Sequence, residues 1–461
     1  MRVLMLNPPY LRGFMRNARW EAFSIAGSEW LPIWLAYATG WLEKHGHDVR
    51  LLDAGIEKLS KERTFQTIKE FKPELTAVYV TTTSMENDLE VANMIKEAGS
   101  EVVLVGPWCS IEPESILKKS GKVSMLVDGE FDFPVLDLAD GKPAEKIHGL
   151  VWKDDSGKIR HNGGDTSVPK DRLDEFPFVS DVYRRHIDLR KYHQAAHLHP
   201  FIDIFTGRGC AWGKCTFCLW PFTICKNSQY RTRSIENVID EIKFIRKELP
   251  WVREIFIQDD TLPAWRAKEL SEAILKSGLK VTWSCYARAD ASMDYGTLSM
   301  MKKAGCRIMH VGYESSDPGI LKSIVKGTTV KTMEDFTKAA NELNLMIHAD
   351  FIVGLPGETE ETIKNTVSWA RKLKVHSYQF TVPKPYPGTP FYSLLEKNGW
   401  LKDGYADYPG MSHEDIVRWN KWALKQTNMS SNYIMRMLVR PREWPRLART
   451  ARYVIPYIFS K

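Results

Sequence analysis

The 461-residue sequence has no apolar run long enough to cross a lipid bilayer. Its longest apolar run, Leu31 to Leu42, is interrupted by Pro32 and falls short of the roughly 18 residues that a membrane-spanning helix needs. The N-terminus also lacks the apolar stretch and the small-residue cleavage site of a secretory signal. These absences predict a cytoplasmic protein.

Cysteine is scarce and unevenly spaced. The chain has 7 cysteines, and three of them, Cys210, Cys215 and Cys218, fall within nine residues. An odd number of cysteines in a long chain without a secretory signal disfavours a disulfide framework and favours metal or redox chemistry. Low-complexity segments and short repeats are also missing from the sequence.

Neither charge sign is in large excess. The chain has 64 Lys and Arg against 57 Asp and Glu, and the net charge of +7 is too diluted over the length to indicate nucleic-acid binding. Hydrophobic residues make up 43% of the sequence, which is enough for a folded core. At about 150 residues per domain, the length predicts two or three domains.

The first third of the chain alternates short runs of Val, Leu and Ile with amphipathic segments. Parallel strands need crossover connections, which are usually helical, so this alternation predicts an α/β fold with a doubly wound, flavodoxin-like (Rossmann-like) parallel sheet over residues 1–145. The five predicted strands are 2–6, 49–52, 75–81, 101–105 and 124–127.

The remainder of the chain divides into three further predicted segments. Residues 146–200 are predicted to form a hairpin and a linker, and residues 201–400 a partial (β/α)6 barrel of the TIM type. Residues 401–461 are predicted to be a helical, basic and aromatic extension, which either lies on an anionic membrane surface or packs on the barrel. The predicted barrel strands are 201–205, 254–258, 280–285, 307–311, 347–353 and 377–382.

A glycine-flanked loop with three cysteines directly follows the first barrel strand. Cys210, Cys215 and Cys218 can hold three irons of a four-iron, four-sulfur cluster and leave the fourth iron open to a substrate or cofactor. A zinc site or three unrelated cysteines are the alternatives. Zinc usually takes four protein ligands, and Cys225 is the only nearby candidate for the fourth.

The cysteine loop and the six-unit barrel resemble the radical S-adenosylmethionine (SAM) enzymes. The resemblance implies a 4Fe-4S cluster on Cys210, Cys215 and Cys218, whose open iron chelates the amino and carboxylate groups of SAM. An electron from the cluster then breaks a carbon–sulfur bond of SAM and gives a 5′-deoxyadenosyl radical. The family usually separates its cysteines by three residues and then two, whereas this chain has four and then two.

Polar residues at the ends of later strands match the same family. The resemblance implies that Asp259 and Asp260, after the second barrel strand, hold the SAM amino group, although paired Asp residues there are also common helix N-caps. Arg288, after the third strand, either neutralises the SAM carboxylate or forms a rim ion pair. Glu314, after the fourth strand, matches the carboxylate that contacts ribose or amine.

The adenine side of the expected SAM site falls on two later loops. Gly354 and Pro356 follow the fifth strand and Gly388 follows the sixth, where backbone groups make the contacts in the family. Phe217, between the second and third cysteines, is expected to pack beside the adenine, and packing in the core is its alternative.

The loops at the carboxyl ends of the first five strands predict a ligand site in the first domain. Asn7, Thr82, Ser84, Gly106 and Pro107 offer amide, hydroxyl and backbone groups at the edge where open parallel sheets bind ligands. No glycine fingerprint for a dinucleotide is present.

These loops, ahead of the barrel, resemble the cobalamin-binding domain of the cobalamin-dependent radical SAM enzymes, over roughly residues 1–400. The chain has Asn7, Pro8 and Pro9 where one family of cobalamin domains presents a cobalt-ligating His. Cobalamin is therefore expected to bind without a protein imidazole. The alternative is a domain that keeps the fold but has lost the cofactor.

The resemblance implies a methyltransferase that adds a methyl group to an unactivated carbon. A cyclase, an oxidase or a carbon–carbon coupling enzyme that does not use cobalamin for methyl transfer is the alternative, and a non-catalytic cobalamin sensor or carrier is disfavoured by the intact cysteine loop. Methylthiolation of tRNA is disfavoured because the enzymes of that group carry three further cluster cysteines in their N-terminal domain. The first domain of this chain has only Cys109. The expected partners are a small-molecule or lipid-like substrate and an electron donor of the flavodoxin or ferredoxin type.

Overall fold

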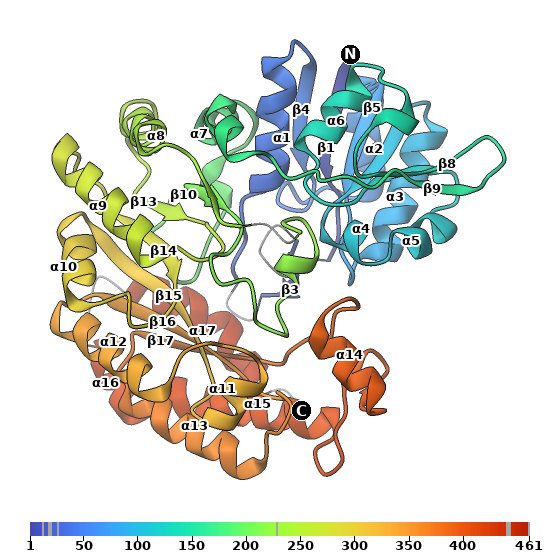
Figure 1. Cartoon of the computed structure of the whole chain (residues 1–461). Helices are drawn as coiled ribbons and strands as arrows, with labels where there is room; N and C mark the ends of the chain where they lie inside the picture. Colours follow the sequence, from blue (N-terminus) through green and yellow to red (C-terminus); the bar gives the residue numbers. More distant parts are fainter. Residues whose placement is uncertain (12, 17–20, 25–26, 227–228, 439–443, 460–461) are drawn as a thin grey trace.

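The computed structural model describes residues 1–11, 13–16, 21–24, 27–226, 229–438 and 444–459. Its two large sheets lie side by side, the first with its helices in blue and cyan and the second in green to orange (Figure 1). This arrangement confirms the predicted α/β fold class, with a Rossmann-like first sheet and a six-stranded parallel second sheet.

The first sheet has the strand order β4-β1-β5-β6-β7-β8-β9, and its first five strands are parallel. The order of those five strands is the flavodoxin-like 2-1-3-4-5, whose direction of winding reverses between β1 and β5. The strands are β1 (Arg2–Asn7), β4 (Asp48–Asp53), β5 (Leu75–Tyr79), β6 (Glu101–Val105) and β7 (Met125–Val127). The helices are α1 (Ile33–Lys44), α2 (Lys61–Phe71), α3 (Met85–Glu97), α4 (Pro107–Ile111), α5 (Pro113–Lys119) and α6 (Asp132–Ala139).

The predicted hairpin forms, but it belongs to the first sheet. β8 (Leu150–Lys153) pairs antiparallel with β7 on one side and with β9 (Ile159–His161) on the other. Helix α7 (Val179–His186) follows in the connecting segment. The division of the chain into domains at 145 and 200 stays a prediction.

The second sheet has the strand order β10-β13-β14-β15-β16-β17, and every neighbouring pair in it is parallel. Its strands are β10 (Phe201–Ile204), β13 (Glu254–Ile257), β14 (Trp283–Ala287), β15 (Cys306–Glu314), β16 (Met346–Ile352) and β17 (Ser377–Thr381). Its helices are α8 (Ile235–Glu248), α9 (Ala264–Ser277), α10 (Tyr295–Lys303), α11 (Pro318–Ser323), α12 (Val330–Glu342), α13 (Glu360–Lys372) and α14 (Pro390–Lys397).

Short antiparallel pairs decorate the loops around the two large sheets. One pair lies near the N-terminus, one flanks the cysteine loop and one follows α14. They are β2 (Phe14–Met15) with β3 (Ala22–Phe23), β11 (Gly207–Arg208) with β12 (Arg231–Thr232), and β18 (Leu401–Lys402) with β19 (Tyr405–Ala406).

Helix α1 joins the two halves of the molecule. Ten consecutive residues of α1, from Ile33 to Leu42, are buried, as expected for a helix that is apolar on every side. It packs on β1 and β4 of the first sheet, and its Tyr37 ring stacks on Phe205 at the end of the first barrel strand, with ring centroids 5.4 Å apart. The core is therefore continuous from one sheet to the other.

The C-terminal extension is helical, as predicted. It contains α15 (His413–Asn428), α16 (Ser431–Leu438) and α17 (Trp444–Phe459). Helix α15 packs on α13 and β17, and α17 packs on α15. Among the described residues, no helix combines the length and the apolar content that crossing a bilayer requires.

Candidate active site between the two sheets

The cysteine loop begins directly after β11. Cys210, Cys215 and Cys218 are half-buried, and none of them forms a disulfide. The backbone N–H of Gly213 donates to Cys210 Sγ at 3.4 Å, and the N–H of Cys218 donates to the carbonyl of Cys215 at 3.1 Å. The three cysteines of this loop are therefore partly accessible, as a cluster ligand set requires, and Cys218 also packs against the core.

Backbone contacts anchor the middle of this loop. The N–H of Thr216 donates to the carbonyl of Ile324 after α11, and the carbonyl of Thr216 accepts from Phe391 of α14, both at 3.1 Å. Phe217 is half-buried and packs on an apolar cluster that includes Ile352 and Leu355. The structure places Phe217 at the rim of the core, and its expected contact with adenine stays a prediction.

Two cations, Arg288 and Lys326, lie beside the cysteine loop. Arg288 donates to the carbonyl of Lys326 at 2.6 Å, and its guanidinium lies 4.7 Å from the centre of the Trp212 ring. Trp212 itself donates to the carbonyl of Val325 at 2.9 Å. Gly327 has φ +70°, and a Cβ there would lie 2.1 Å from the Trp212 ring, so this close approach requires glycine.

Glu314 and Lys326 form a buried ion pair next to Cys215. Lys326 Nζ donates to Glu314 Oε1 at 2.6 Å, and Glu314 has φ +64°, a strained conformation for a residue with a side chain. Burial raises the pKa of the Cys215 thiol above its ordinary value, and the positive charge of Lys326 opposes that rise. Sequence reasoning missed Lys326 because a single lysine after a short helix carries no motif.

Asp259 is held by hydrogen bonds from neighbouring protein groups. Its carboxylate accepts hydrogen bonds from the backbone N–H groups of Thr206, at 2.6 Å, and Gly207, at 3.1 Å, and from the Tyr230 hydroxyl at 2.5 Å. The side chain is fully buried. Asp259 therefore fixes the chain that leads into the cysteine loop, and its predicted contact with the SAM amino group stays a prediction.

The neighbours of Asp259 remain candidates for ligand contact. Asp260 is buried close enough to Cys225 that its charge helps to raise the pKa of that thiol, after burial itself. Gln258, at the end of β13, has a buried amide oxygen without a hydrogen-bond partner among the described residues. A buried polar atom of this kind indicates a missing ligand or water.

The two loops predicted to hold adenine are built differently. At the first loop, Glu358 accepts from the backbone N–H groups of Gly354, at 2.5 Å, and Leu355, at 3.2 Å, and burial raises the pKa of Glu358 to about 7. Pro356 beside them is half-buried. At the second loop, Gly388 is exposed and has φ +83°.

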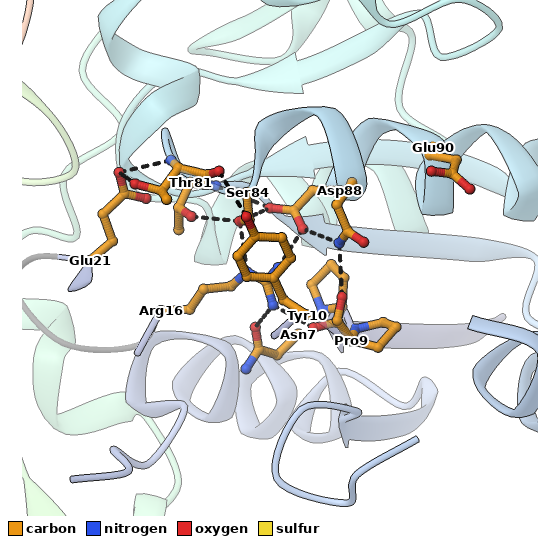
Figure 2. Close-up of polar contacts among 12 residues, drawn as sticks. Asn7, Pro9, Tyr10, Arg16, Glu21, Thr81, Ser84, Asp88 and Glu90 are labelled. Atoms are coloured by element: carbon orange, nitrogen blue, oxygen red, sulfur yellow. Dashed lines mark hydrogen bonds and ion pairs between the residues drawn. The ribbon is translucent and has the colours of Figure 1, made fainter. Parts of the chain in front are cut away.

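In the first domain, Arg16 fills the point where the winding of the sheet reverses. Figure 2 shows its guanidinium among Asn7, the last residue of β1, Ser84, which directly precedes α3, and Asp88 of α3. Arg16 Nε donates to Ser84 Oγ at 3.1 Å, and Arg16 pairs with Asp88 at 2.5 Å. Asn7 also donates to Asp53 at 2.8 Å. Asn7 and Ser84, predicted to contact cobalamin, engage other protein groups with their side chains, and their contact with cobalamin stays a prediction.

The other residues predicted to contact cobalamin are Thr82, Gly106 and Pro107. Thr82 and Pro107 are half-buried. Gly106 has φ +112°, and a Cβ there would lie 2.8 Å from the carbonyl of Val80, so the backbones approach closely only with glycine. The buried hydroxyl of Tyr79, the last residue of β5, has no hydrogen-bond partner within the described parts of the chain.

Two ionic contacts join this edge to the barrel. Lys384, after β17, donates to Glu21 Oε1 and to Thr83 Oγ1, both at 3.0 Å. Burial alone would raise the pKa of Glu21, but the charge of Lys384 lowers it below its ordinary value. Arg208, two residues before Cys210, donates to Asp132 at 2.7 Å and to Glu130 at 3.1 Å in the first domain. The cysteine loop and the first-domain edge are therefore held together.

Comparisons with known proteins agree with this geometry. The model of the radical SAM superfamily matches residues 204–370, and that of the B12 binding domain matches residues 23–136. An uncharacterized methyltransferase of Pyrococcus horikoshii is 30% identical over 410 residues, which cover 87% of this chain and 84% of the relative. The chain belongs to the cobalamin-dependent radical SAM enzymes. A relative from Rubrivivax gelatinosus, named anaerobic magnesium-protoporphyrin IX monomethyl ester cyclase, is 26% identical and is covered over 70% of its length.

Solved structures of radical SAM enzymes share the fold. The radical SAM methyltransferase TsrM from Kitasatospora setae superimposes with a TM-score of 0.68 and 19% identity, covering 87% of this chain and 79% of TsrM. Apo OxsB, a cobalamin-dependent SAM radical enzyme, gives a TM-score of 0.69 with 15% identity, over 98% of this chain and 72% of OxsB.

The residues present fit the cofactors of this radical SAM family, which are a 4Fe-4S cluster, SAM and cobalamin. Cys210, Cys215 and Cys218 supply the three thiolates, and the unpartnered oxygen of Gln258 lies at a neighbouring strand end. The unpartnered hydroxyl of Tyr79 offers a donor to an amide-rich ligand at the first-domain edge. The predicted cofactor set is confirmed, and the individual SAM and cobalamin contacts remain predictions.

Proposed function

We propose that this enzyme transfers a methyl group to an unactivated carbon of a small-molecule substrate. The observation that carries the proposal is that Arg208, next to the cysteine loop, and Lys384, after β17, both bind residues of the first domain. The proposal is also supported by the relative from P. horikoshii, which is named as an uncharacterized methyltransferase. A substrate between the two edges would lie within reach of both cofactors, which radical methyl transfer requires.

When bound, the cofactors supply an electron, a 5′-deoxyadenosyl radical and a transferable methyl group. The protein's own residues then have four tasks. Cys210, Cys215 and Cys218 hold the cluster, and Lys326 and Arg288 place positive charge beside it. Asp260 and Gln258 are our candidates for orienting SAM. The contacts of Arg208, which is buried, and of Lys384, which is half-buried, fix the distance between the two cofactor sites and help to exclude water.

A second candidate function is a cyclisation or another radical reaction without methyl transfer. The relatives named cyclase favour it, at 26% identity. The two candidates differ in what happens to SAM. Methyl transfer gives S-adenosylhomocysteine together with 5′-deoxyadenosine, whereas the alternative gives 5′-deoxyadenosine alone.

The test uses SAM with a trideuterated methyl group. We expect the reconstituted holoenzyme, a chemical reductant and a metabolite and lipid extract of the source cells to yield a product that carries the labelled methyl group. The variant with Cys210, Cys215 and Cys218 all replaced by Ala is the control. A substrate that is consumed without gaining label would overturn methyl transfer and support the cyclase alternative.

We also propose a lipid-like substrate, a flavodoxin or ferredoxin as electron donor, and peripheral contact of the C-terminal extension with membranes. Support for membrane contact comes from Trp444, Arg452, Tyr453 and Ile455 of α17, which are exposed. The tail residues Arg440 and Arg442 lie outside the described residues. Truncation before residue 433 should abolish co-sedimentation with anionic liposomes, and equal co-sedimentation of both forms would contradict the proposal.

A further inference from the structure

Three polar side chains gather on one face of the second sheet. His310 lies on β15, four residues before Glu314, and His348 and Asp350 lie on the neighbouring strand β16. In the parallel register His310 is opposite His348, and Gly312 is opposite Asp350. Because side chains alternate along a strand, residues 348 and 350 point to the same side as His310.

The potential ligand atoms of this cluster converge. One atom from each of His310, His348 and Asp350 lies within 4.8 Å of the other two, and His348 Nε2 is 3.5 Å from Asp350 Oδ1. His310 is 4% exposed, and its buried Nε2 has no hydrogen-bond partner among the residues that the structure describes. An unsatisfied polar atom in a core costs free energy, so it points to a ligand that completes it.

Neighbouring polar groups orient His348 as they do in metal sites. The ring nitrogen Nδ1 of His348 lies 2.7 Å from Ser377 Oγ, and Nε2 lies 3.3 Å from Gln379 Oε1. A metal-bound histidine characteristically uses the ring nitrogen that does not bind the metal for an outer contact, and the contact of Nδ1 with Ser377 has this form. The contact of Nδ1 with Ser377 leaves Nε2 on the side of Asp350.

A purely structural role would give the imidazole of His310 a partner. His197, whose ring centroid is 5.1 Å from that of His310, shows such a role, because its Nδ1 lies 2.9 Å from the carboxylate of Glu254. Arg307 pairs with the same Glu254 carboxylate at 2.8 Å, so the positive charge of Arg307 is compensated by Glu254. The Nε2 of His310 has no equivalent carboxylate contact within the described residues.

We propose that His310, His348 and Asp350 form a binding site for one divalent transition-metal ion inside the barrel, separate from the iron–sulfur cluster. Two imidazoles and one carboxylate are a donor set that binds zinc and ferrous iron, and they leave coordination positions open. Those positions would take water or an oxygen or nitrogen atom of a substrate. The site does not depend on methyl transfer and stands if that proposal fails.

The test counts metals in the reconstituted holoenzyme after incubation with zinc and removal of loose metal by a chelator. Mass spectrometry distinguishes the three sites, because cobalt reports cobalamin, and zinc, or iron in excess of the 4Fe-4S cluster, reports the new site. We expect about one zinc per chain in the wild type. His310→Gln and Asp350→Asn should lose this zinc, and Ser377→Ala should bind zinc about tenfold more weakly. The control is His161→Gln, on the exposed hairpin, which should retain the zinc.

Unchanged iron and cobalt in the variants would show that the fold and both cofactors are intact. Asp350→Asn is the safer variant, since Asp350 is only half-buried. X-ray absorption at the zinc edge should show nitrogen and oxygen ligands without sulfur. Zinc that is absent from the wild type, that persists in both ligand variants, or that has sulfur ligands overturns the proposal.

Discussion

Arg208 Nη1 donates to Asp132 at 2.7 Å, although the two residues are 76 positions apart, with Arg208 in β11 and Asp132 at the start of α6. Glu130 accepts from the same guanidinium at 3.1 Å, and all three side chains are buried. The Arg208 guanidinium also packs over the Trp34 ring, 4.8 Å from its centre. Since Cys210 follows two residues later, this ion pair positions the cysteine loop relative to the first domain.

Replacing Arg208 by Met should destabilise the protein by about 3–5 kcal/mol, because it leaves the Asp132 carboxylate buried without its cation and leaves Glu130 with Arg231 alone. We expect a lower thermal midpoint and a smaller iron content after reconstitution. Arg184→Met is the matched control, since Arg184 pairs with Asp181 at 2.7 Å on the surface and should change stability by less than about 1 kcal/mol. Equal losses in the two variants would contradict the structural role of Arg208.

The sequence predicted the strands and the cysteine loop well, because both depend on local patterns. Runs of Val, Ile and Leu identified the parallel strands, and the spacing of Cys210, Cys215 and Cys218 identified the cluster loop. The roles of Asp259 and Arg16 were not predictable in this way. Each depends on partners from distant segments of the chain, such as Tyr230 for Asp259 and Asp88 of α3 for Arg16, and no local pattern reports such contacts.

Single replacement of Cys210, Cys215 or Cys218 by Ala should abolish reductive cleavage of SAM. Three thiolates hold the cluster, and loss of one leaves two irons without protein ligands. The measurement is the visible absorption of the anaerobically reconstituted protein together with release of 5′-deoxyadenosine. Cys109→Ala, a buried cysteine of the first domain, should keep both. A full cluster spectrum in a loop variant would contradict the ligand assignment.

Lys326→Gln should make the reduction potential of the cluster more negative. The substitution removes a positive charge near Cys215 and leaves Glu314 unpaired, so adding an electron becomes less favourable, by on the order of tens of millivolts. The potential can be measured by redox titration with electron paramagnetic resonance. The double variant Lys326→Gln, Glu314→Gln should recover most of the shift, because it restores the local charge balance. A potential that does not change in the single variant would exclude this electrostatic role.

Glu358 predicts a pH dependence that can be isolated by one substitution. Burial raises the pKa of Glu358 to about 7 from its ordinary value of 4.5, so folding favours the protonated carboxyl. The stabilising contribution of this group is complete below 4.5 and is lost as the pH rises through about 7. We therefore expect the wild type to lose stability relative to Glu358→Gln over this window, by on the order of 3 kcal/mol in the free energy of unfolding.

Thermal midpoints of the wild type and Glu358→Gln, measured at about pH 5 and about pH 8, give the comparison that tests this prediction. The glutamine oxygen can still accept from the N–H groups of Gly354 and Leu355, so the variant keeps the loop while removing the titration. Glu360→Gln, at an exposed position of α13, should follow the wild type at both pH values. Parallel behaviour of the wild type and Glu358→Gln would mean that this carboxyl titrates alike in the folded and unfolded chains, and that the loop beside the cysteines does not respond to pH through Glu358.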